Sequence, residues 1–319
     1  MFDRTKSRPR KSNCISSGFS VGATLTCLAS FVALSSSANA QTVYEGFNPM
    51  QGAAIDTQTG GTGFTSSWTD QSPGEHFTVA SSLSYTDING NMLNTTGGLL
   101  ASIHKTTGSI ANRSFTTLTP NSGVGSKKVY YLSFLINPVD NPNPLSPDFS
   151  YGGIAIGENN VNKYAFIGIA GGTDKYTIQS PAVGFPVAPG TGSSVSGVQG
   201  RTKFLVAKLT LDPISSLDQI DLWVDPLLGS PLGAPTVSNG SLSLDLGNVS
   251  QFFIKNSASN GAGSYSFDEI RLGDTYASVS PFGTGTSSTV PEPGSLALLA
   301  GTVVTGGLFS IRRQKAPRR

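Results

Sequence analysis

The stretch Val129-Tyr-Tyr-Leu-Ser-Phe-Leu-Ile136 is almost entirely apolar, and it decides the fold that the sequence predicts. Its β-branched and aromatic residues favour a strand. An apolar run of this length with no polar face suits a strand in the middle of a sheet that is covered on both faces. We therefore expect a central β-strand over residues 128–136.

Short runs of the same kind recur between residues 41 and 281, separated by glycine, asparagine, proline and serine, which is the pattern of strands and turns. One of them, residues 202–211, alternates imperfectly and places Lys203 and Lys208 at the expected solvent positions. This region shows no amphipathic helix of about ten or more residues. The sequence therefore predicts an all-β fold, a two-sheet antiparallel sandwich or jelly roll. The clearest runs are 42–47, 77–79, 82–85, 99–103, 113–117, 128–136, 151–156, 164–170, 175–178, 202–211, 219–224, 242–246, 251–255, 265–272 and 277–279.

The N-terminal segment has the organisation of a signal peptide. Residues 14–34 are mildly apolar, and Ala38-Asn39-Ala40 has the small-residue pattern of a cleavage site. We expect cleavage between Ala40 and Gln41, which would remove residues 1–40. Because polar residues interrupt the apolar stretch, a retained N-terminal anchor is the alternative. The positive n-region consists of Arg4, Lys6, Arg8, Arg10 and Lys11.

The C-terminal segment, residues 290–319, has three parts. It begins with Val290-Pro-Glu-Pro293, which is stiff because each proline fixes its own backbone and biases its predecessor to extended geometry. An uncharged, mostly apolar run follows over residues 295–311; as a helix it would span about 25 Å, close to a hydrocarbon core of about 30 Å. We expect a transmembrane helix with its basic end in the cytoplasm, and a buried core helix is the alternative. The closing cations are Arg312, Arg313, Lys315, Arg318 and Arg319.

This order of Pro-Glu-Pro, apolar run and basic cluster resembles the PEP-CTERM sorting signal of Gram-negative and related bacteria. The resemblance implies that an exosortase-type membrane peptidase recognises Pro291, Glu292 and Pro293, and that the tail is cleaved near this motif during export. Proteins with such a tail typically accompany exopolysaccharide or biofilm production. The resemblance thus implies a chain that is anchored transiently in the inner membrane and then reaches the cell surface or the extracellular matrix.

Removing both terminal segments changes the charge of the chain. The whole sequence has 21 basic and 19 acidic residues, but residues 41–289 keep 11 basic and 17 acidic ones. A domain with a negative net charge lacks the basic face that nucleic acid requires. Both cysteines, Cys14 and Cys27, lie in the signal region, so the exported domain has no disulfide, thiolate metal site or cysteine nucleophile. Residues 41–280 are enough for one sandwich domain, and the Gly/Ser/Thr-rich residues 281–289 are expected to be a flexible linker.

Several short motifs resemble, in their order along the chain, the concanavalin A-like (laminin-G-like) jelly roll of many exported bacterial proteins. They are Tyr44-Glu-Gly-Phe47, Gly60-Gly-Thr-Gly-Phe64 with Trp68, residues 128–136, residues 204–211, Ile220-Asp-Leu-Trp-Val-Asp225 and Ser266-Phe-Asp-Glu-Ile-Arg-Leu-Gly273. The resemblance implies that the first and last strands lie side by side, with residues 44–47 against residues 267–272.

The sequence offers little for catalysis. Glucanases of the concanavalin A-like fold use a Glu-x-Asp-x-x-Glu strand, and no such motif is present between residues 41 and 289. Asp268 and Glu269 are adjacent, so in a regular strand they would point to opposite faces. His76, beside Glu75, and His104 are expected in polar loops, and no Gly-x-Ser-x-Gly elbow surrounds a serine. We therefore expect a non-catalytic protein.

Two groups of residues are candidates for binding. Asp212, Asp218, Asp221 and Asp225 crowd one region, and carboxylates are the hard oxygen ligands that Ca²⁺ prefers. The alternative is that these aspartates end strands and start turns. Trp68 follows a glycine-rich loop, so we expect it to be exposed, where it could stack on a sugar ring.

The resulting hypothesis is an exported, surface-associated β-sandwich that binds or organises extracellular polysaccharide. A structural coat protein without a ligand and a glycan hydrolase are the alternatives.

Overall fold

The structure, a computed structural model, describes residues 41–48, 52–103, 109–118, 127–140, 151–158, 163–170, 174–180, 191–213, 217–239, 246, 248–257 and 264–283. They all belong to the second of two compact units, Asn39–Arg319, and the first, Met1–Ala38, lies outside the described residues. The predicted signal peptide and the predicted segment 290–319, with its sorting motif and transmembrane helix, also lie outside them. Within the described ranges, no helix has the length and apolarity that a membrane crossing needs.

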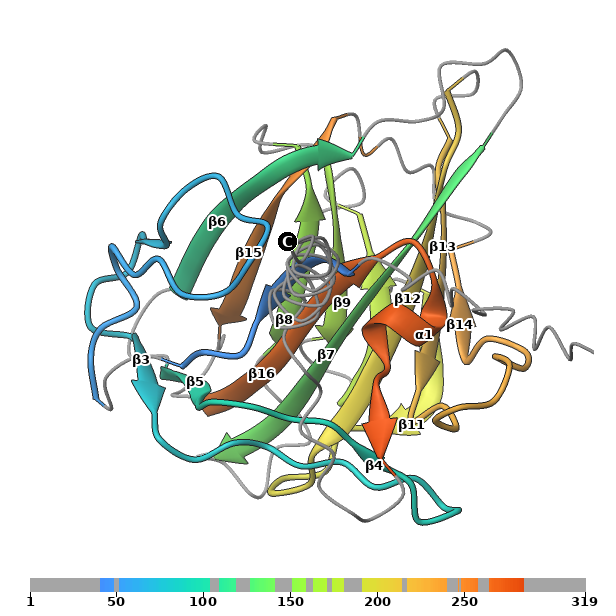
Figure 1. Ribbon diagram of the computed structural model, residues 1–319, viewed down its shortest axis with the longest axis horizontal. Coiled ribbons are helices and arrows are strands. Elements are labelled where there is room, and N and C mark those ends of the chain that lie inside the picture. The colour runs from blue at the N-terminus through green and yellow to red at the C-terminus, as the bar shows by residue number, and fades with distance from the viewer. Residues whose placement is uncertain are drawn as a thin grey trace, which may run out of the picture. The chain divides into compact units, whose positions relative to one another are not determined.

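Two antiparallel sheets form the fold (Figure 1). The eight-stranded sheet has the order β14-β13-β12-β7-β16-β5-β3, and β1 pairs with β16 outside this path. Its strands are β1 (Gln41–Glu45), β3 (His76–Val79), β5 (Leu99–Ile103), β7 (Lys128–Asp140), β12 (Lys203–Leu211), β13 (Gln219–Val224), β14 (Val237–Ser238) and β16 (Ser264–Gly273).

The seven-stranded sheet has the order β11-β10-β9-β8-β15-β6-β2. Its strands are β2 (Thr69–Asp70), β6 (Ser109–Leu118), β8 (Tyr151–Gly157), β9 (Tyr164–Ile169), β10 (Lys175–Gln179), β11 (Thr191–Ser196) and β15 (Val249–Ser257). A small two-stranded sheet pairs β4 (Met92–Leu93) with β17 (Phe282–Gly283), and α1 (Tyr276–Val279) is a single helical turn. Because β17 pairs with β4, the fold extends to Gly283, and residues 281–283 do not belong to the linker that the sequence predicted.

The sequence prediction of an all-β, two-sheet antiparallel sandwich is therefore confirmed. The apolar stretch at residues 128–136 is the first part of β7, which lies between β12 and β16 in the middle of its sheet. The expected pairing of the first and last long strands is also confirmed, because Val43 pairs with Leu272 and Glu45 with Ile270.

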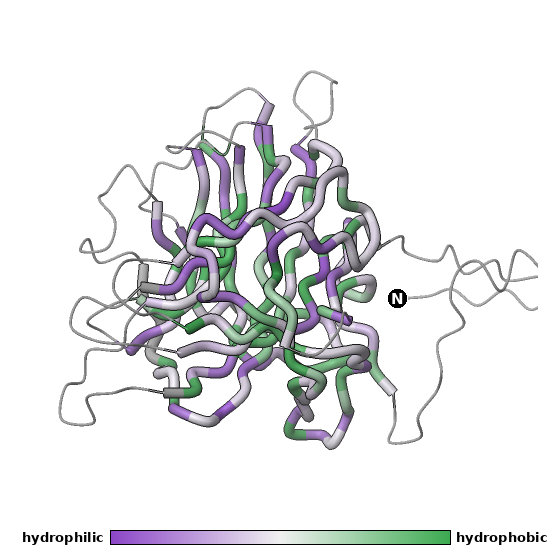
Figure 2. The backbone as a smooth tube through the Cα atoms, turned by 90° about the vertical axis from the view of Figure 1, so that its left-hand side faces the viewer, coloured by the Kyte–Doolittle hydropathy of each residue, from purple (hydrophilic) through white to green (hydrophobic). Residues whose placement is uncertain are grey.

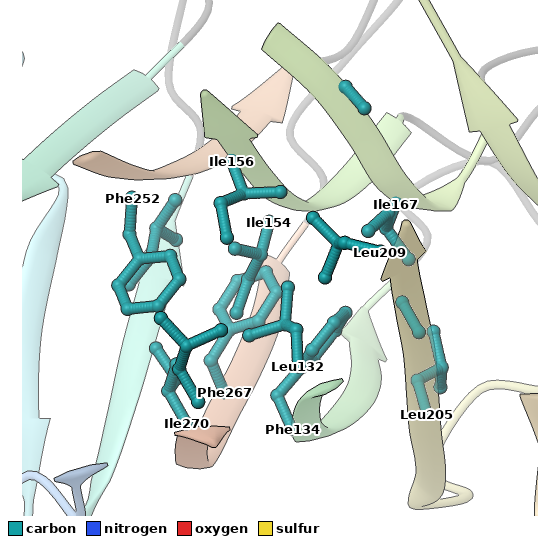
Figure 3. Close-up of a cluster of buried hydrophobic side chains, with 14 of the residues drawn as sticks. Leu132, Phe134, Ile154, Ile156, Ile167, Leu205, Leu209, Phe252, Phe267 and Ile270 are labelled. Atoms are coloured by element: carbon teal, nitrogen blue, oxygen red, sulfur yellow. The ribbon is translucent and has the colours of Figure 1, made fainter. Parts of the chain in front are cut away.

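The main core fills the space between the two sheets. Figure 3 shows side chains of both sheets pointing toward one another, among them Leu132 and Phe134 of β7 and Ile154 and Ile156 of β8. These four side chains are fully buried. Figure 2 shows hydrophobic and hydrophilic residues interspersed along the tube, and strands such as β15 place alternate residues, Phe252 and Ile254, in this core.

A second hydrophobic cluster lies on the outer face of the eight-stranded sheet. Leu83, Tyr85 and Leu93 come from the segment 80–98, and they pack on Leu135 and Phe204 of the sheet. Strand β7 is therefore apolar on both faces because this segment covers its outer face. The prediction that β7 is covered on both sides is confirmed.

A β-bulge in β16 corrects one expectation. Phe267 and Ile270 both enter the main core, and the register with β7 shifts between Asp268 and Arg271. Two residues, Asp268 and Glu269, therefore occupy the outward position between them, and Glu269 has a φ of +55°. The two carboxyl groups share a face, which the regular alternation of a strand would not allow.

An ion pair joins the two sheets at one end of the sandwich. Arg113 of β6 donates through Nη1 to Glu45 of β1 at 2.5 Å, and both side chains are 3% exposed. Trp68 donates from Nε1 to the same Glu45 oxygen at 3.0 Å. The guanidinium also lies 3.8 Å from the centre of the Phe64 ring. Every partner here is buried or half-buried, so this group of residues is part of the fold.

Candidate functional site

Strand β15 presents an unusual outward face. Phe252 and Ile254 enter the main core, so Gln251, Phe253 and Lys255 point away from it. The neighbouring strands place Gly157, Ala155 and Gly153 of β8 directly beside these three residues. The small residues of β8 leave the long side chains of β15 free to extend toward β9.

Four aromatic rings gather on this outer face. Tyr151 of β8 meets Phe166 of β9 edge to face, with ring centres 5.9 Å apart. Tyr164 of β9 and Phe253 of β15 have ring centres 6.0 Å apart. Phe166 and Tyr164 are buried, whereas Tyr151 and Phe253 are half-buried. Each half-buried ring is thus supported by a buried one.

Two glycines allow this arrangement. A Cβ atom at Gly153 would lie 2.8 Å from Cζ of Phe166, and one at Gly168 would lie 3.0 Å from the same atom. Both distances are shorter than ordinary van der Waals contact, and the same Cβ atoms would also meet backbone at 2.3 Å. The Phe166 ring can therefore lie across β8 and β9 only because both positions lack a side chain.

Lys255 supplies a positive charge among these rings. Its Nζ atom lies 4.0 Å from the centre of the Tyr164 ring and 5.6 Å from that of Phe253. The residue is 7% exposed, and burial lowers the pKa of the ammonium group to about 8. Burial also raises the pKa of the Tyr164 hydroxyl, with a smaller effect from Tyr151.

Two amide side chains continue the site along β15 and β6. Gln251 donates from Nε2 to Oδ1 of Asn112 at 2.9 Å. The Oε1 atom of Gln251 is buried and accepts no hydrogen bond within the described structure. A buried carbonyl oxygen without a donor is costly, so this atom suits a donor that arrives with a ligand or a water molecule. We call Tyr151, Tyr164, Phe166, Gln251, Phe253 and Lys255 the outer-face cluster.

The sequence carries a local signal for this cluster. In Gln251-Phe-Phe-Ile-Lys255, the odd positions are glutamine, phenylalanine and lysine, while the even positions are apolar. This alternation indicates that Gln251, Phe253 and Lys255 share the outward face of the strand. The partners on β8 and β9 could not be identified, because strand order is not encoded locally.

Trp68, the aromatic residue that the sequence favoured for sugar stacking, is not on the surface. It is 1% exposed, and its ring lies 6.0 Å from that of Phe47 in the main core. The expectation that Trp68 is exposed is wrong, because the loop before it folds back to β1 and Glu45 accepts its indole N–H.

The four aspartates considered for calcium each form hydrogen bonds or ion pairs with different partners. Asp218 accepts from the backbone N–H of Asp212 at 3.0 Å, and Asp225 pairs with Lys203 at 2.5 Å. Asp221 accepts from the Ser238 hydroxyl. Among the described residues, no three potential ligands gather in a way that could hold a metal ion. The contacts favour the alternative role of ending strands and fixing turns.

His76 is buried, not in a solvated turn as expected. Its Nδ1 atom lies 2.9 Å from Oδ1 of Asp70, and both side chains are 0% exposed. Its Nε2 atom has no hydrogen-bond partner in the described part of the chain, and the hydroxyl of Ser102, opposite it on β5, contacts Ser109 instead. Within the described residues, His76 and Ser102 are therefore not joined by a hydrogen bond. His104 lies outside the described residues.

The paired carboxyl groups at the bulge are also enclosed. Asp268 accepts from the N–H of Leu83 at 2.8 Å, and Glu269 accepts from the N–H of Thr96 and pairs with Arg271. Asp268 and Glu269 are 0% exposed beneath the segment 80–98. They hold this segment on the sheet.

The sequence matches no protein-family model and no curated protein. Among solved structures, the endo-beta-1,4-glucuronan lyase from the fungus Trichoderma reesei is similar with a TM-score of 0.44 and 10% identity, covering 76% of this chain and 99% of that one. The endo-1,3-beta-glucanase from Streptomyces sioyaensis is similar with a TM-score of 0.39 and 13% identity, and the match covers 73% of this chain and 95% of that one. The Lotus tetragonolobus seed lectin is similar with a TM-score of 0.34 and 8% identity, and the match covers 65% of this chain and 98% of that one.

These similarities are too low to place the chain in a family or to transfer an activity. The assignment of the fold rests on the strand order and register described above: two antiparallel sheets, with β1 of the N-terminal side against β16 near the C-terminal side. This is the arrangement that the resemblance to concanavalin A-like proteins implied.

Proposed function

We propose that this chain is an exported, non-catalytic protein that binds extracellular polysaccharide through the outer-face cluster. The observation that carries the proposal is the pair of half-buried rings, Tyr151 and Phe253, each backed by a buried aromatic ring on the outer face of the sheet. Sugar rings have apolar faces that pack on aromatic side chains, while amide and ammonium groups bind their polar substituents.

Export is the part of the proposal that rests on the two terminal segments. The n-region and cleavage pattern around Ala40 and Gln41 favour secretion, and the Pro291-Glu292-Pro293 motif favours sorting by an exosortase-type peptidase. A final position at the cell surface or in the extracellular matrix would bring the chain into contact with polysaccharide.

The absence of catalysis is proposed from the positions of the acids. A glycan hydrolase of the usual kind needs two carboxyl groups beside its substrate. The paired carboxyl groups Asp268 and Glu269 are enclosed on the other sheet, and the strands of the seven-stranded sheet contain one carboxylate, Asp70, which faces His76 inside the sandwich.

The proposal predicts that Phe253→Leu and Tyr151→Leu weaken polysaccharide binding by about three- to tenfold, because leucine keeps apolar volume but loses the flat ring. The measurement is the retardation of the purified full-length chain in native gels that contain a series of polysaccharides at increasing concentration.

The matched control is Tyr131→Leu, which alters a half-buried tyrosine on β7 of the other sheet. Thermal unfolding of each variant separates weaker binding from loss of the fold. If no polysaccharide retards the wild-type chain, or if Tyr131→Leu has the same effect as Phe253→Leu, the proposed site is wrong. A chain that binds none of them would be better described as a structural coat protein.

A further inference from the structure

Three neighbouring segments of the chain expose large apolar side chains: residues 86–92, residues 226–229 after β13, and β17. In the part of the chain that the structure describes, seven large apolar side chains are exposed, and these segments contribute four of them. The four are Ile88 at 92% exposure, Met92 at 45%, Leu227 at 37% and Phe282 at 39%. We call these four residues the apolar patch. Apolar side chains that gather on a surface mark a contact with another molecule or with a membrane.

Contacts between the three segments bring the patch together. Strand β4 of the first segment pairs with β17. The Oδ2 atom of Asp87 accepts the N–H of Leu228 at 3.0 Å, which joins the first segment to the second. A Cβ atom at Gly229 would collide with the Phe282 ring, so this ring lies against the second segment. The apolar patch is therefore part of the fixed structure of the domain.

Ile88 is held outward by the turn that carries it. The backbone carbonyl of Asp87 accepts the N–H of Gly90 at 3.0 Å, and its carboxylate accepts the N–H groups of Asn89 and Asn91 at 2.9 Å each. Gly90 has a φ of +81°, which glycine adopts without steric cost. Because the turn is already ordered, burying the isoleucine against an outside surface costs little backbone entropy.

The apolar patch presents no charge to the solvent. Asp87 is the single charged residue among residues 86–92, 226–229 and 282–283, and it is 6% exposed. An apolar surface can therefore cover the patch without removing a charged group from water, which would be costly. The neighbouring Asn89 and Asn91 are polar but uncharged, which suits the boundary between lipid headgroups and acyl chains.

The chain leaves the described fold at this patch. Strand β17 ends at Gly283, and residues 284–294 separate it from the uncharged apolar run 295–311. These eleven residues reach about 40 Å at most when fully extended. If residues 295–311 cross a membrane, as the sequence predicts, Gly283 stays within this distance of the lipid. A tether of this length gives an effective concentration in the millimolar range, at which a weak apolar contact is sufficient.

We propose that the apolar patch docks on the lipid surface of the membrane that holds residues 295–311. This inference rests on the export and membrane anchoring in the proposed function, and it adds the orientation of the domain before processing. Docking would keep residues 291–293 close to the bilayer, where a membrane peptidase acts. Since the contact depends on the tether, cleavage near these residues would also release the domain from the lipid.

The experiment introduces a tryptophan into the patch of the full-length chain by Ile88→Trp. The chain is reconstituted in phosphatidylcholine vesicles with brominated acyl chains, which quench tryptophan on contact. Leu217→Trp is the matched control, because Leu217 is 54% exposed and lies beyond the opposite end of β13 from Leu227. The native Trp68 and Trp223 are buried and contribute equally to both proteins.

Bromination should lower the emission that Ile88→Trp adds by about twofold or more, because the side chain lies among the upper acyl groups. The emission that Leu217→Trp adds should change by less than about a tenth under the same conditions. Because the patch presents no charge, quenching of Ile88→Trp should be the same in vesicles with anionic lipid and in high salt.

Equal quenching of the two variants, or quenching that requires anionic lipid and disappears in high salt, would overturn the inference. Emission from Ile88→Trp that shifts to shorter wavelength as the protein concentration rises, without quenching by lipid, would assign the patch to a second copy of the chain instead. In both cases retardation by polysaccharide would be unaffected, so the proposed function would stand. A full-length chain that does not float with the vesicles would reject the inference together with the predicted membrane anchor.

Discussion

Among single residues, Asp268 has a strongly shifted pKa. Its carboxyl group is fully buried on the outer face of the eight-stranded sheet. Burial, with a smaller effect from Glu269, raises its pKa to about 9, although the N–H groups of Leu83 and Glu269 oppose the shift. The carboxyl group is therefore neutral in the folded chain near neutral pH, and Glu269 is the partner of Arg271.

This raised pKa predicts a dependence of stability on pH. The folded chain keeps a proton on Asp268 that the unfolded chain loses above about pH 4. The contribution of this proton to the free energy of unfolding is therefore complete below pH 4 and is lost as the pH rises through about 9. Asp268→Asn carries no titratable proton at this site. Between pH 5 and pH 8.5, the free energy of unfolding should decrease more for the wild type than for Asp268→Asn. The two decreases should differ by more than about 1 kcal/mol.

The measurement is urea unfolding of both proteins at the two pH values. Asp212→Asn, at a partly exposed carboxylate that pairs with Lys127, is the control for replacing an aspartate with its amide. Parallel curves for wild type and Asp268→Asn would show that Asp268 does not titrate in this range.

At the level of elements, β1 and β6 belong to different sheets and are joined by the Glu45–Arg113 ion pair. Glu45→Gln or Arg113→Met should each lower the free energy of unfolding by about 3–5 kcal/mol, because either change leaves a buried charge without its partner. The double variant should lose less than the sum of the two single changes.

Chemical denaturation of the four proteins measures this coupling. The control is Lys203→Met, which breaks the more exposed pair with Asp225, and which should cost about 1 kcal/mol or less. Additive effects of Glu45→Gln and Arg113→Met would mean that the two side chains stabilise the chain independently.

How far the sequence predicted these elements depends on the range of the interactions. Strand β7 was identified because Leu132, Phe134 and Leu135 form a local apolar run, and both of its faces are indeed covered. The bulge at Glu269 was missed, because a positive φ at a glutamate is imposed by neighbours, not by residue type. Trp68 was misplaced for a similar reason, since its acceptor, Glu45, lies 23 residues earlier in the chain.

The candidate site shows the same limit. The alternation of Gln251, Phe253 and Lys255 was available in the sequence, whereas their neighbours Tyr151 and Tyr164 come from strands that local patterns cannot order. The strand faces are thus encoded locally, and the meeting of those faces in one cluster depends on the topology of the sheet.

For the whole molecule, processing at both ends is the prediction that decides where the sandwich works. The protein isolated from producing cells should begin at Gln41, end near Pro291–Gly294 and be found outside the inner membrane. Cell fractionation followed by intact mass measurement tests this. A species that keeps Arg319 in the membrane fraction would instead indicate a permanently tethered domain, and replacing Pro291 and Pro293 with alanine should produce that species if the motif directs sorting.

The pairing of β1 with β16 also bears on the order of folding. Tyr44 and Glu269 touch although they lie 225 residues apart in the chain, so β16, the strand with which β1 pairs in its sheet, is made only when almost the whole domain has been synthesised. Contacts of such long range make folding slow, because a large loop must close before they form. A chain that leaves the cytoplasm N-terminus first could therefore not complete the eight-stranded sheet until its last long strand has emerged on the other side.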